Sequence, residues 1–368
     1  MKNSMGNVLI LTLFGESHGP YIGAVLDGLA PGMPVDEAFI RDQLALRRPY
    51  GKISTSRVEA DEFVLASGVF NGKTTGTPLT ILIPNTQQQS RDYEENRFLP
   101  RPSHADYTAY VKYRGFEDYR GGGHFSGRLT AALAAAGAVV LPALKEKGII
   151  IGTHIRTLGK RKDVPFSEDP EILAGQIQRV NEQRFAVLDA DAADGMIKDI
   201  EEAAANKDSI GGTLETAIAG MPAGIGEPWF DTLEGEIAKW VFSIPGIKGV
   251  EFGNAFSLTE KTGSEYNDAF SITEDGEIIT KTNHNAGING GISNGMPIIF
   301  RTAVKPTPSI FRPQETVDLK RGENTVLTLS GRHDPAIIHR VRVVQDSVTA
   351  LAMADLLSMH YGTDYLGK

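Results

Sequence analysis

The run from Ser126 to Lys147 constrains the fold more than any other part of the chain. It is rich in alanine and is nearly uncharged until Lys145. A helix that is apolar on every side must be buried deep within a protein. We therefore expect this run to form a central helix that other elements surround.

Apolar periodicity predicts the remaining elements. Apolar runs at 8–14 and 21–27 flank a glycine-rich turn and predict two strands, and the spacing over 35–46 predicts a helix. Further strands are expected at 63–70, 78–84, 148–154, 213–219, 248–257 and 296–304, and further helices at 169–183, 190–206 and 347–361. The fold class is therefore mixed α/β. Since no linker or fixed-period repeat divides the chain, residues 1–368 are expected to form a single domain.

Composition excludes several classes of protein. Hydrophobic residues make up 41% and charged residues 23%, as in ordinary globular proteins. The apolar stretch from Val8 to Phe14 is too short to cross a bilayer, so no membrane partner is expected. A net charge of -9 argues against nucleic acid, and a phosphorylated ligand would need a local basic pocket. The absence of cysteine excludes disulfides and thiolate metal sites, and it fits any reducing compartment. We expect a cytoplasmic protein and assign no metal site.

Two cationic segments are candidate anion sites. Arg47, Arg48, Lys52 and Arg57 form a cluster that suits a phosphate or carboxylate, although solvated charges at a helix end would look the same. The glycine-dense segment 120–128 leads into the buried helix, where backbone N–H groups could meet an anion. Alternatively, its glycines only let the chain turn. A buried Arg128 would need a counter-ion.

His104 is a candidate proton carrier. Ser103 and Asp106 have the spacing of a helix-capping pair, which places His104 in the first turn of a helix. The positive end of the helix dipole there disfavours imidazolium, so proton exchange near neutral pH is plausible. A histidine that merely packs at a helix start is the alternative.

Three other segments are ambiguous on their own. Residues 67–74 resemble a phosphate-binding P-loop but have Ser67 in place of its first glycine, which favours a tight turn before a strand. Residues 283–295 suit either close approach to a flat ligand or ordinary turns. Residues 331–335 place a guanidinium, an imidazole and a carboxylate in succession, yet Asp before Pro also starts turns.

Taken together, these segments resemble the chorismate synthase family, in the same order and at compatible spacing over nearly the whole chain. The resemblance rests on Gly-Glu-Ser-His-Gly-Pro-Tyr-Ile-Gly at 15–23 with its continuation to Gly28, and on the segments 67–77, 101–107 and 331–335.

The resemblance implies a β-α-β sandwich, a homotetramer and reduced FMN in a basic pocket. It implies that a carbon-oxygen lyase removes phosphate from 5-enolpyruvylshikimate-3-phosphate by 1,4-anti elimination to give chorismate, the last common step of the shikimate pathway to aromatic amino acids. No net redox change occurs, because the flavin lends an electron and recovers it. Whether NADPH acts as the indirect reductant stays open.

The resemblance also assigns roles to residues. His18 corresponds to the general acid for the departing phosphate, His104 to the residue that protonates reduced flavin, and Asp334 to a proton relay near flavin N5. The implied substrate ligands are Ser17, Arg47, Arg48, Lys52, Arg101, Ser126 and Arg128. The implied flavin ligands are His124, Phe125, Ser126, Pro245, Gly246, Gly290, Lys305, Pro306, Thr307, Pro308, Ser309 and Arg332.

The segment 124–129 departs from the family pattern. Many relatives have Arg-Ser-Ser-Ala-Arg-Glu where this chain has His-Phe-Ser-Gly-Arg-Leu, so one cation, one hydroxyl and one carboxylate are missing. This change leaves two alternatives. One is a flavin lyase or reductase for another phosphorylated ring, and the other is a flavin-binding or phosphate-binding protein without catalysis.

Overall fold

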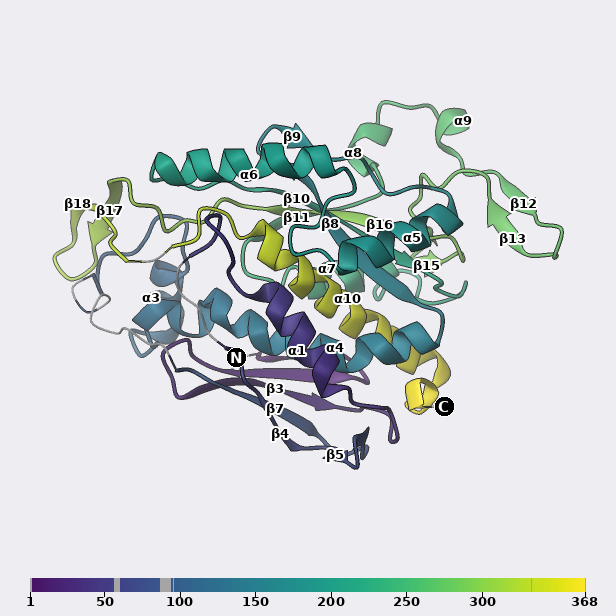
Figure 1. Ribbon diagram of the computed structural model, residues 1–368, viewed down its shortest axis with the longest axis horizontal. Coiled ribbons are helices and arrows are strands. Elements are labelled where there is room, and N and C mark those ends of the chain that lie inside the picture. Colours follow the sequence, from purple (N-terminus) through teal and green to yellow (C-terminus); the bar gives the residue numbers. More distant parts are fainter. Residues whose placement is uncertain (1, 56–59, 87–93, 95, 332, 368) are drawn as a thin grey trace.

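Two five-stranded antiparallel sheets enclose a layer of helices (Figure 1). The structure is a computed structural model that describes residues 2–55, 60–86, 94, 96–331 and 333–367. In spatial order the first sheet contains β1 (Ser4–Met5), β2 (Ile10–Gly15), β3 (Tyr21–Asp27), β7 (Leu79–Pro84) and β4 (Val64–Ser67). The second contains β11 (Ile247–Phe252), β16 (Ile298–Val304), β10 (Gly212–Ala219), β8 (Ile150–Leu158) and β9 (Arg161–Lys162). This arrangement is the expected β-α-β sandwich.

The helices between the sheets pack on one another as well as on the strands. α4 packs on β3 and β7, α10 packs on β8 and β10, and the two helices pack together. α1 contacts both of them, and α7 contacts α10. The bounds of these helices are α1 (Glu37–Arg47), α4 (Thr130–Glu146), α7 (Leu233–Val241) and α10 (Ile338–Tyr361).

The alanine-rich run forms the expected buried helix. α4 is buried on all sides from Thr130 to Val140, and short side chains allow α10 to approach closely. At Gly137, a Cβ would lie 2.3 Å from the Cβ of Ser347 in α10, so glycine is required there. By length and composition alone the stretch Gly127–Glu146 could cross a membrane, but 83% of it is buried inside this protein, as in the core helix of a globular fold.

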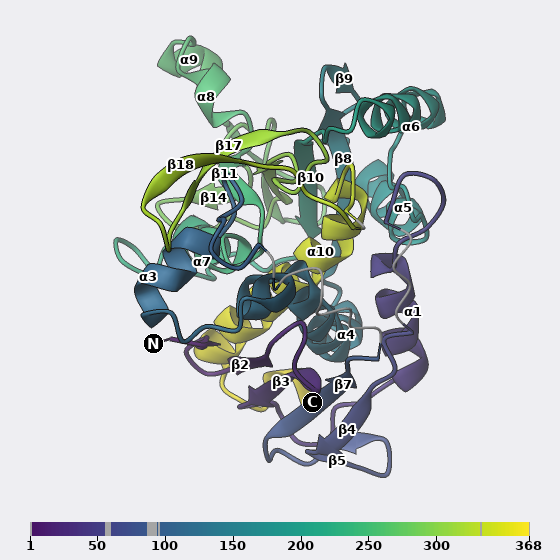
Figure 2. The ribbon, with the colours of Figure 1, turned by 90° about the vertical axis from the view of Figure 1, so that its left-hand side faces the viewer.

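Other elements cover the outer faces and the ends. α5 packs on the face of β8 and β10 that is opposite to α10, and α6 contacts β9. α3 and the hairpin β17–β18 lie together at one end of the sandwich, toward the viewer in Figure 2. The remaining elements are α3 (Asp106–Tyr113), α5 (Pro170–Asn181), α6 (Ala190–Ala205), α8 (Ala255–Leu258), α9 (Gly263–Tyr266), β5 (Val69–Phe70), β6 (Lys73–Thr74), β12 (Phe270–Ile272), β13 (Ile278–Thr280), β14 (Ile288–Asn289), β15 (Ile292–Ser293), β17 (Gln314–Asp318), β18 (Glu323–Leu327) and the 3-10 turns η1 (Arg120–Phe125), η2 (Gly127–Leu129) and η3 (Tyr365–Gly367).

Two of the segments that sequence alone left ambiguous form turns. Residues 67–74 end β4 and form the β5–β6 hairpin, in which Asn71 and Gly72 have φ of 49° and 70°. The tight turn expected there is confirmed. Residues 283–295 contain the β14–β15 hairpin, which turns at Gly290 and Gly291.

Several predicted elements have different bounds, and two of these differences are large. The strand expected over 248–257 ends at Phe252, and α8 follows it. The last helix begins at Ile338, although the sequence predicted a start at 347. The polar side chains at its start are buried against partners, so they gave no apolar pattern in the sequence. Gln345, for example, donates a hydrogen bond to Thr216 and accepts one from Thr302.

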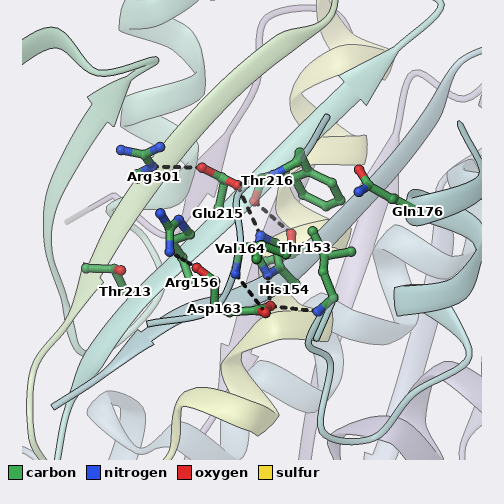
Figure 3. A network of polar contacts seen from close by, with 12 residues as sticks. Thr153, His154, Arg156, Asp163, Val164, Gln176, Thr213, Glu215, Thr216 and Arg301 are labelled. Atoms are coloured by element: carbon green, nitrogen blue, oxygen red, sulfur yellow. Dashed lines mark hydrogen bonds and ion pairs between the residues drawn. The ribbon is translucent and has the colours of Figure 1, made fainter. Parts of the chain in front are cut away.

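A buried charge cluster fixes the outer face of the second sheet (Figure 3). His154 in β8 lies between two carboxylates: its Nδ1 is 2.8 Å from Asp163, and its Nε2 is 3.0 Å from Glu215 in β10. Arg301 in β16 pairs with the other oxygen of Glu215 at 2.8 Å. Glu215 also accepts the backbone N–H of Phe166, so this cluster joins three strands to the segment before α5.

Candidate active site

Two adjacent cavities lie where α3, the glycine-rich turn η1 and the start of α10 meet. The smaller cavity has a volume of about 400 Å³ and the larger about 660 Å³. Among the described residues, seven line both cavities: Leu13, Arg101, His104, Ala105, His124, Phe125 and His333. Volumes in this range are typical of sites for small organic ligands.

The cavities bring the three predicted catalytic residues into one region. His18 lines the smaller cavity, Asp334 lines the larger one, and His104 lines both. These side chains come from positions far apart in the sequence, and the fold gathers them at one end of the sandwich.

The loop that carries His18 is joined to the glycine-rich turn. Ser17 donates its backbone N–H to the carbonyl of Gly123 at 3.1 Å, and His124 Nδ1 lies 2.8 Å from the carbonyl of Gly15. Asn85 donates to the carbonyls of Glu16 and Gly19. His18 is therefore held from two sides and is only 4% exposed.

Glycine is required at position 121 for the loop that carries His18 to pack against the glycine-rich turn. Gly121 has a φ of 61°, and a Cβ there would lie 2.6 Å from the ring of His18 and 2.6 Å from Ser17 Oγ. Ser17 Oγ itself hydrogen-bonds the carbonyls of Arg120 and Gly121 and is fully buried. Ser17 thus binds the glycine-rich turn and does not line either cavity.

His104 is oriented by a carboxylate. Asp106 accepts a hydrogen bond from Nδ1 of His104 at 2.6 Å and forms a two-point ion pair with Arg101, with both contacts at 2.8 Å. Burial lowers the pKa of His104, and the charges of Arg101 and Lys305 add to this effect, while Asp106 opposes it. Because Asp106 binds Nδ1, the Nε2 of a neutral His104 carries the free lone pair.

The expected helix cap at Ser103 is wrong. α3 begins at Asp106 after Ala105, which makes no side-chain cap, and Ser103 has a φ of 59°. His104 therefore precedes the helix, and burial rather than the helix dipole lowers its pKa. The local pattern was misleading because Asp106 binds Arg101 and His104 instead of the chain at Ser103.

The larger cavity is lined by cations. Arg47, Arg101, Arg128, Lys305 and Arg340 all contribute to its wall. A cavity with this lining attracts anionic ligands.

Arg47 and Arg128 share a buried counter-ion that sequence reasoning did not identify. Asp61 pairs with Arg47 at 3.2 Å through one oxygen and with Arg128 through the other. Burial alone would raise the pKa of Asp61, but the two guanidinium groups outweigh burial and lower it. The need of Arg128 for a counter-ion is confirmed. Arg128 also donates to Asn85 and to the carbonyl of Pro84, so its donors are largely engaged within the protein.

The other predicted substrate ligands divide into two groups. Arg101 and Ser126 line the larger cavity, although Arg101 is also held by Asp106 and by Ser309 at 3.1 Å. Arg48 and Lys52 are not on either cavity wall; Arg48 donates to the carbonyl of Ala60, and Lys52 is exposed. Arg57 lies outside the described residues.

Most predicted flavin ligands gather in the larger cavity. Its wall includes His124, Phe125, Ser126, Pro245, Gly246, Lys305, Pro306, Thr307, Pro308 and Ser309. Gly290, in the β14–β15 turn, is on neither cavity wall, and Arg332 lies outside the described residues.

Three buried polar atoms on this wall have no hydrogen-bond partner among the described residues: Arg47 Nε, Thr307 Oγ1 and His333 Nε2. Buried polar atoms are normally paired, so unpaired ones on a cavity wall indicate a polar ligand. Apolar surface from Phe125 and Ile337 faces the same space. An aromatic, multiply charged ligand such as FMN fits this lining.

Sequence reasoning missed several residues of the site. Asp61, Asn85 and Arg340 were not singled out, and Asp106 was assigned to a helix cap. The signal available in the sequence was the acidic residue type of Asp61 and Asp106, because buried arginines require acidic partners. The partners lie too far away in the sequence for spacing to identify them.

Comparisons with known proteins match one family over nearly the whole chain. Residues 9–358 match the family model described as chorismate synthase. Chorismate synthase of Thermococcus gammatolerans is 44% identical over 352 residues, covering 96% of each chain. Chorismate synthase of Lachnoclostridium phytofermentans is 44% identical over 369 residues, covering 100% of this chain and 98% of the relative. A crystal structure of chorismate synthase superposes with a TM-score of 0.77 at 28% identity, covering 98% of this chain and 94% of that one.

The fold, the site and these relatives define a carbon-oxygen lyase that acts on a phosphorylated small molecule. The chain belongs to the chorismate synthase family, an enzyme family of aromatic amino acid biosynthesis.

Proposed function

We propose that this enzyme converts 5-enolpyruvylshikimate-3-phosphate to chorismate by 1,4-anti elimination of phosphate and a ring hydrogen, with reduced FMN and without net redox change. The observation that carries this proposal is the meeting of His18, His104 and Asp334 around two adjacent cavities, one of which is lined by cations. Proton carriers in a cation-lined site suit a reaction that releases phosphate.

The residues fit bound FMN in the larger cavity. Lys305 to Ser309, Pro245, Gly246 and the segment 124–126 would hold it, and Thr307 Oγ1 and His333 Nε2 would gain the partners they lack. When bound, reduced FMN supplies an electron for the elimination and recovers it afterwards.

The chain's own residues move protons and stabilise negative charge. His18, buried behind the glycine-rich turn, donates a proton to the departing phosphate. His104 would exchange a proton with the bound flavin through Nε2, since Asp106 holds its Nδ1. Asp334 would act as the proton relay for the bound flavin. Arg47, Arg101 and Arg128 provide the positive potential for the substrate's phosphate and carboxylates.

We also propose a homotetramer of single-domain subunits in the cytoplasm, with NADPH as an indirect source of electrons for the flavin. These properties rest on family resemblance. Size-exclusion chromatography with light scattering measures the assembly state. An anaerobic comparison of chemically reduced FMN with FMN plus NADPH measures whether the chain reduces its own flavin.

The test is an anaerobic assay with purified protein, chemically reduced FMN and 5-enolpyruvylshikimate-3-phosphate. We expect chorismate to form, and its absence would refute the proposal. A panel of other phosphorylated rings under the same conditions distinguishes a lyase or reductase of different specificity.

The variants His104→Ala and Asp334→Ala test the alternative of a binding protein without catalysis. We expect both to lose turnover by roughly 100-fold or more, as for a general acid or base. FMN affinity, measured by fluorescence titration, should stay close to that of the wild type. An active wild type with fully active variants would reject the assigned roles.

A further inference from the structure

The carboxylate of Asp334 is held by donors from two different parts of the chain. Its Oδ1 accepts the backbone N–H of Thr55 at 2.8 Å, and its Oδ2 accepts Nη1 of Arg340 at 2.6 Å. With a donor on each oxygen, the carboxylate cannot rotate freely. Asp334, Thr55 and Arg340 all line the larger cavity, so this arrangement sets how the carboxylate faces a ligand there.

Arg340 joins Asp334 to the end of α1. Its Nε donates to the carbonyl of Arg47 at 2.9 Å, while its Nη1 binds Asp334. The guanidinium is planar and rigid, so these two contacts fix its own orientation. Arg340 is thereby a fixed cation beside Asp334 rather than a mobile surface charge.

His339, the neighbour of Arg340 in α10, holds the segment that carries Thr55. Its Nε2 lies 2.8 Å from Oγ of Ser54, the residue before Thr55. The ring is 1% exposed, stacks on Phe185 and meets the edge of Tyr50. Burial and the charge of Arg340 lower the pKa of His339 to about 3, so the ring stays neutral during catalysis near neutral pH. Its hydrogen bond to Ser54 therefore does not titrate in that range.

We propose that His339, Ser54 and Arg340 are positioning residues that aim the Asp334 carboxylate into the larger cavity. Arg340 acts directly on one oxygen, and His339 acts through Ser54 and the backbone N–H of Thr55 on the other. This inference rests on the proposed function of Asp334 as a proton relay. It extends that function to His339 and Ser54, two residues that do not touch the reacting atoms.

The charges around Asp334 determine what a change at Arg340 does. Among the described residues, the charged and titratable groups that interact with Asp334 are Arg340, His339 and His333, and Arg47 lies beyond Arg340. His339 and His333 both have lowered pKa values because they are buried. Arg340 is consequently the permanent cation of this group, and its removal would leave one oxygen of the Asp334 carboxylate without its charged partner.

The experiment compares Ser54→Ala, His339→Gln, Arg340→Met and Arg340→Lys in the anaerobic assay with reduced FMN. We expect kcat to fall by roughly tenfold to a hundredfold in Ser54→Ala and Arg340→Met, because small displacements of a catalytic group are costly. KM should stay within about twofold in Ser54→Ala. Arg340→Lys keeps the positive charge next to Asp334 but lacks the planar guanidinium, so it should retain more of the wild-type kcat than Arg340→Met.

Two controls match these variants. Ser67→Ala removes a serine hydroxyl that bonds Pro78 and Thr80 on the first sheet, and Arg161→Met removes an exposed arginine that pairs with Asp199. Both should keep the kcat and KM of the wild type. If Ser54→Ala and Arg340→Met behave like these controls, the positioning role is wrong.

Hydrogen exchange at Thr55 provides a test that does not need turnover. The peptide that contains Thr55 should exchange several times faster in Ser54→Ala, His339→Gln and Asp334→Ala than in the wild type or Ser67→Ala. Unchanged exchange would overturn the proposal, and so would faster exchange with unchanged kcat in an active enzyme. An inactive wild type with faster exchange in these variants would refute the proposed reaction but support the contact network.

Discussion

Asp106 accepts a hydrogen bond from Nδ1 of His104 at 2.6 Å, and the same carboxylate forms a two-point ion pair with Arg101. The imidazole is therefore fixed in one tautomer and one orientation while it lines both cavities. Burial would raise the pKa of Asp106, but Arg101 and His104 outweigh burial and lower that pKa strongly. Asp106 thus remains a carboxylate throughout the pH range in which His104 can exchange a proton.

Asp106→Asn should lower turnover by roughly 100-fold. An asparagine can present its amide nitrogen to Nδ1, which would leave His104 in the wrong tautomer, and it breaks the ion pair with Arg101. Loss of the negative charge should also lower the pKa of His104 further. The measurement is kcat against pH in the anaerobic assay, with FMN affinity measured in parallel.

Asp208→Asn is the control for that change, since Asp208 pairs with Arg312 on the surface. It should retain wild-type kcat. A fully active Asp106→Asn enzyme would show that His104 does not depend on this carboxylate.

Gly121→Ala should remove most activity without removing the cavity itself. The new Cβ would lie 2.6 Å from the ring of His18 in a backbone with a φ of 61°, so either the ring or the turn must move. A displaced general acid is expected to lower kcat by roughly 100-fold. Gly175→Ala in α5 is the matched control, because its Cβ would meet nothing within 4 Å. Equal activity of the two variants would contradict the role of His18.

Local sequence patterns predicted many of the helices and strands, because apolar residues recur along these elements with the spacing of a helix or a strand. The strand expected over 21–27 is β3 with the same bounds, and the apolar run after Ser126 forms α4. The start of α10 was missed because buried polar residues such as Gln345 do not produce an apolar stripe. Their partners lie on strands that are distant in the sequence.

Pairings within the site were less accessible to sequence reasoning. The family motifs pointed to His18, His104 and Asp334, which the fold places around two adjacent cavities. Asp61 pairs with Arg128 across 67 positions of sequence, and no spacing rule connects them. Asp106 satisfied a local capping pattern that the ion pair with Arg101 overrode, because a charged pair in a partly buried place outweighs a cap on the backbone.

Asp61→Asn should destabilise the protein by about 3–5 kcal/mol, the cost of leaving buried charges without their partner. Asp61 neutralises both Arg47 and Arg128, and all three side chains are at most 6% exposed. Burial lowers the pKa of Arg47 to about 10 even with Asp61 present, which indicates how poorly solvated that guanidinium is. The free energy of unfolding from urea titration measures the effect. Asp199→Asn, which breaks the exposed pair with Arg161, should change it much less, and equal effects would contradict the argument.

The cluster around His154 should make stability depend on pH in both directions (Figure 3). Burial lowers the pKa of His154, but hydrogen bonds and charges from Asp163 and Glu215 outweigh burial and raise it above the ordinary 6.5. A raised pKa means that this contribution is fully present below pH 6.5 and is lost as the pH rises through the folded-state value.

The two carboxylates act in the opposite direction. Burial raises the pKa values of Asp163 and Glu215, but His154 and nearby backbone N–H groups outweigh burial and lower them below 3.8 and 4.5. Their contribution is therefore present above these values and is lost as the pH falls through the folded-state values. Together, the three groups should stabilise the fold most between about pH 5 and 6.5.

His154→Gln tests this dependence. The variant should be less stable by about 3–5 kcal/mol near pH 6, because the two carboxylates would face each other without a cation between them. The difference from the wild type should shrink as the pH rises above the folded-state pKa of His154, since the wild type then loses the same charge. Urea unfolding midpoints from pH 5 to 9 measure this difference, and His360→Gln, at an exposed histidine near the end of α10, is the control. A difference that stays constant over this range would show that His154 is neutral in the folded protein and that the cluster does not hold an imidazolium.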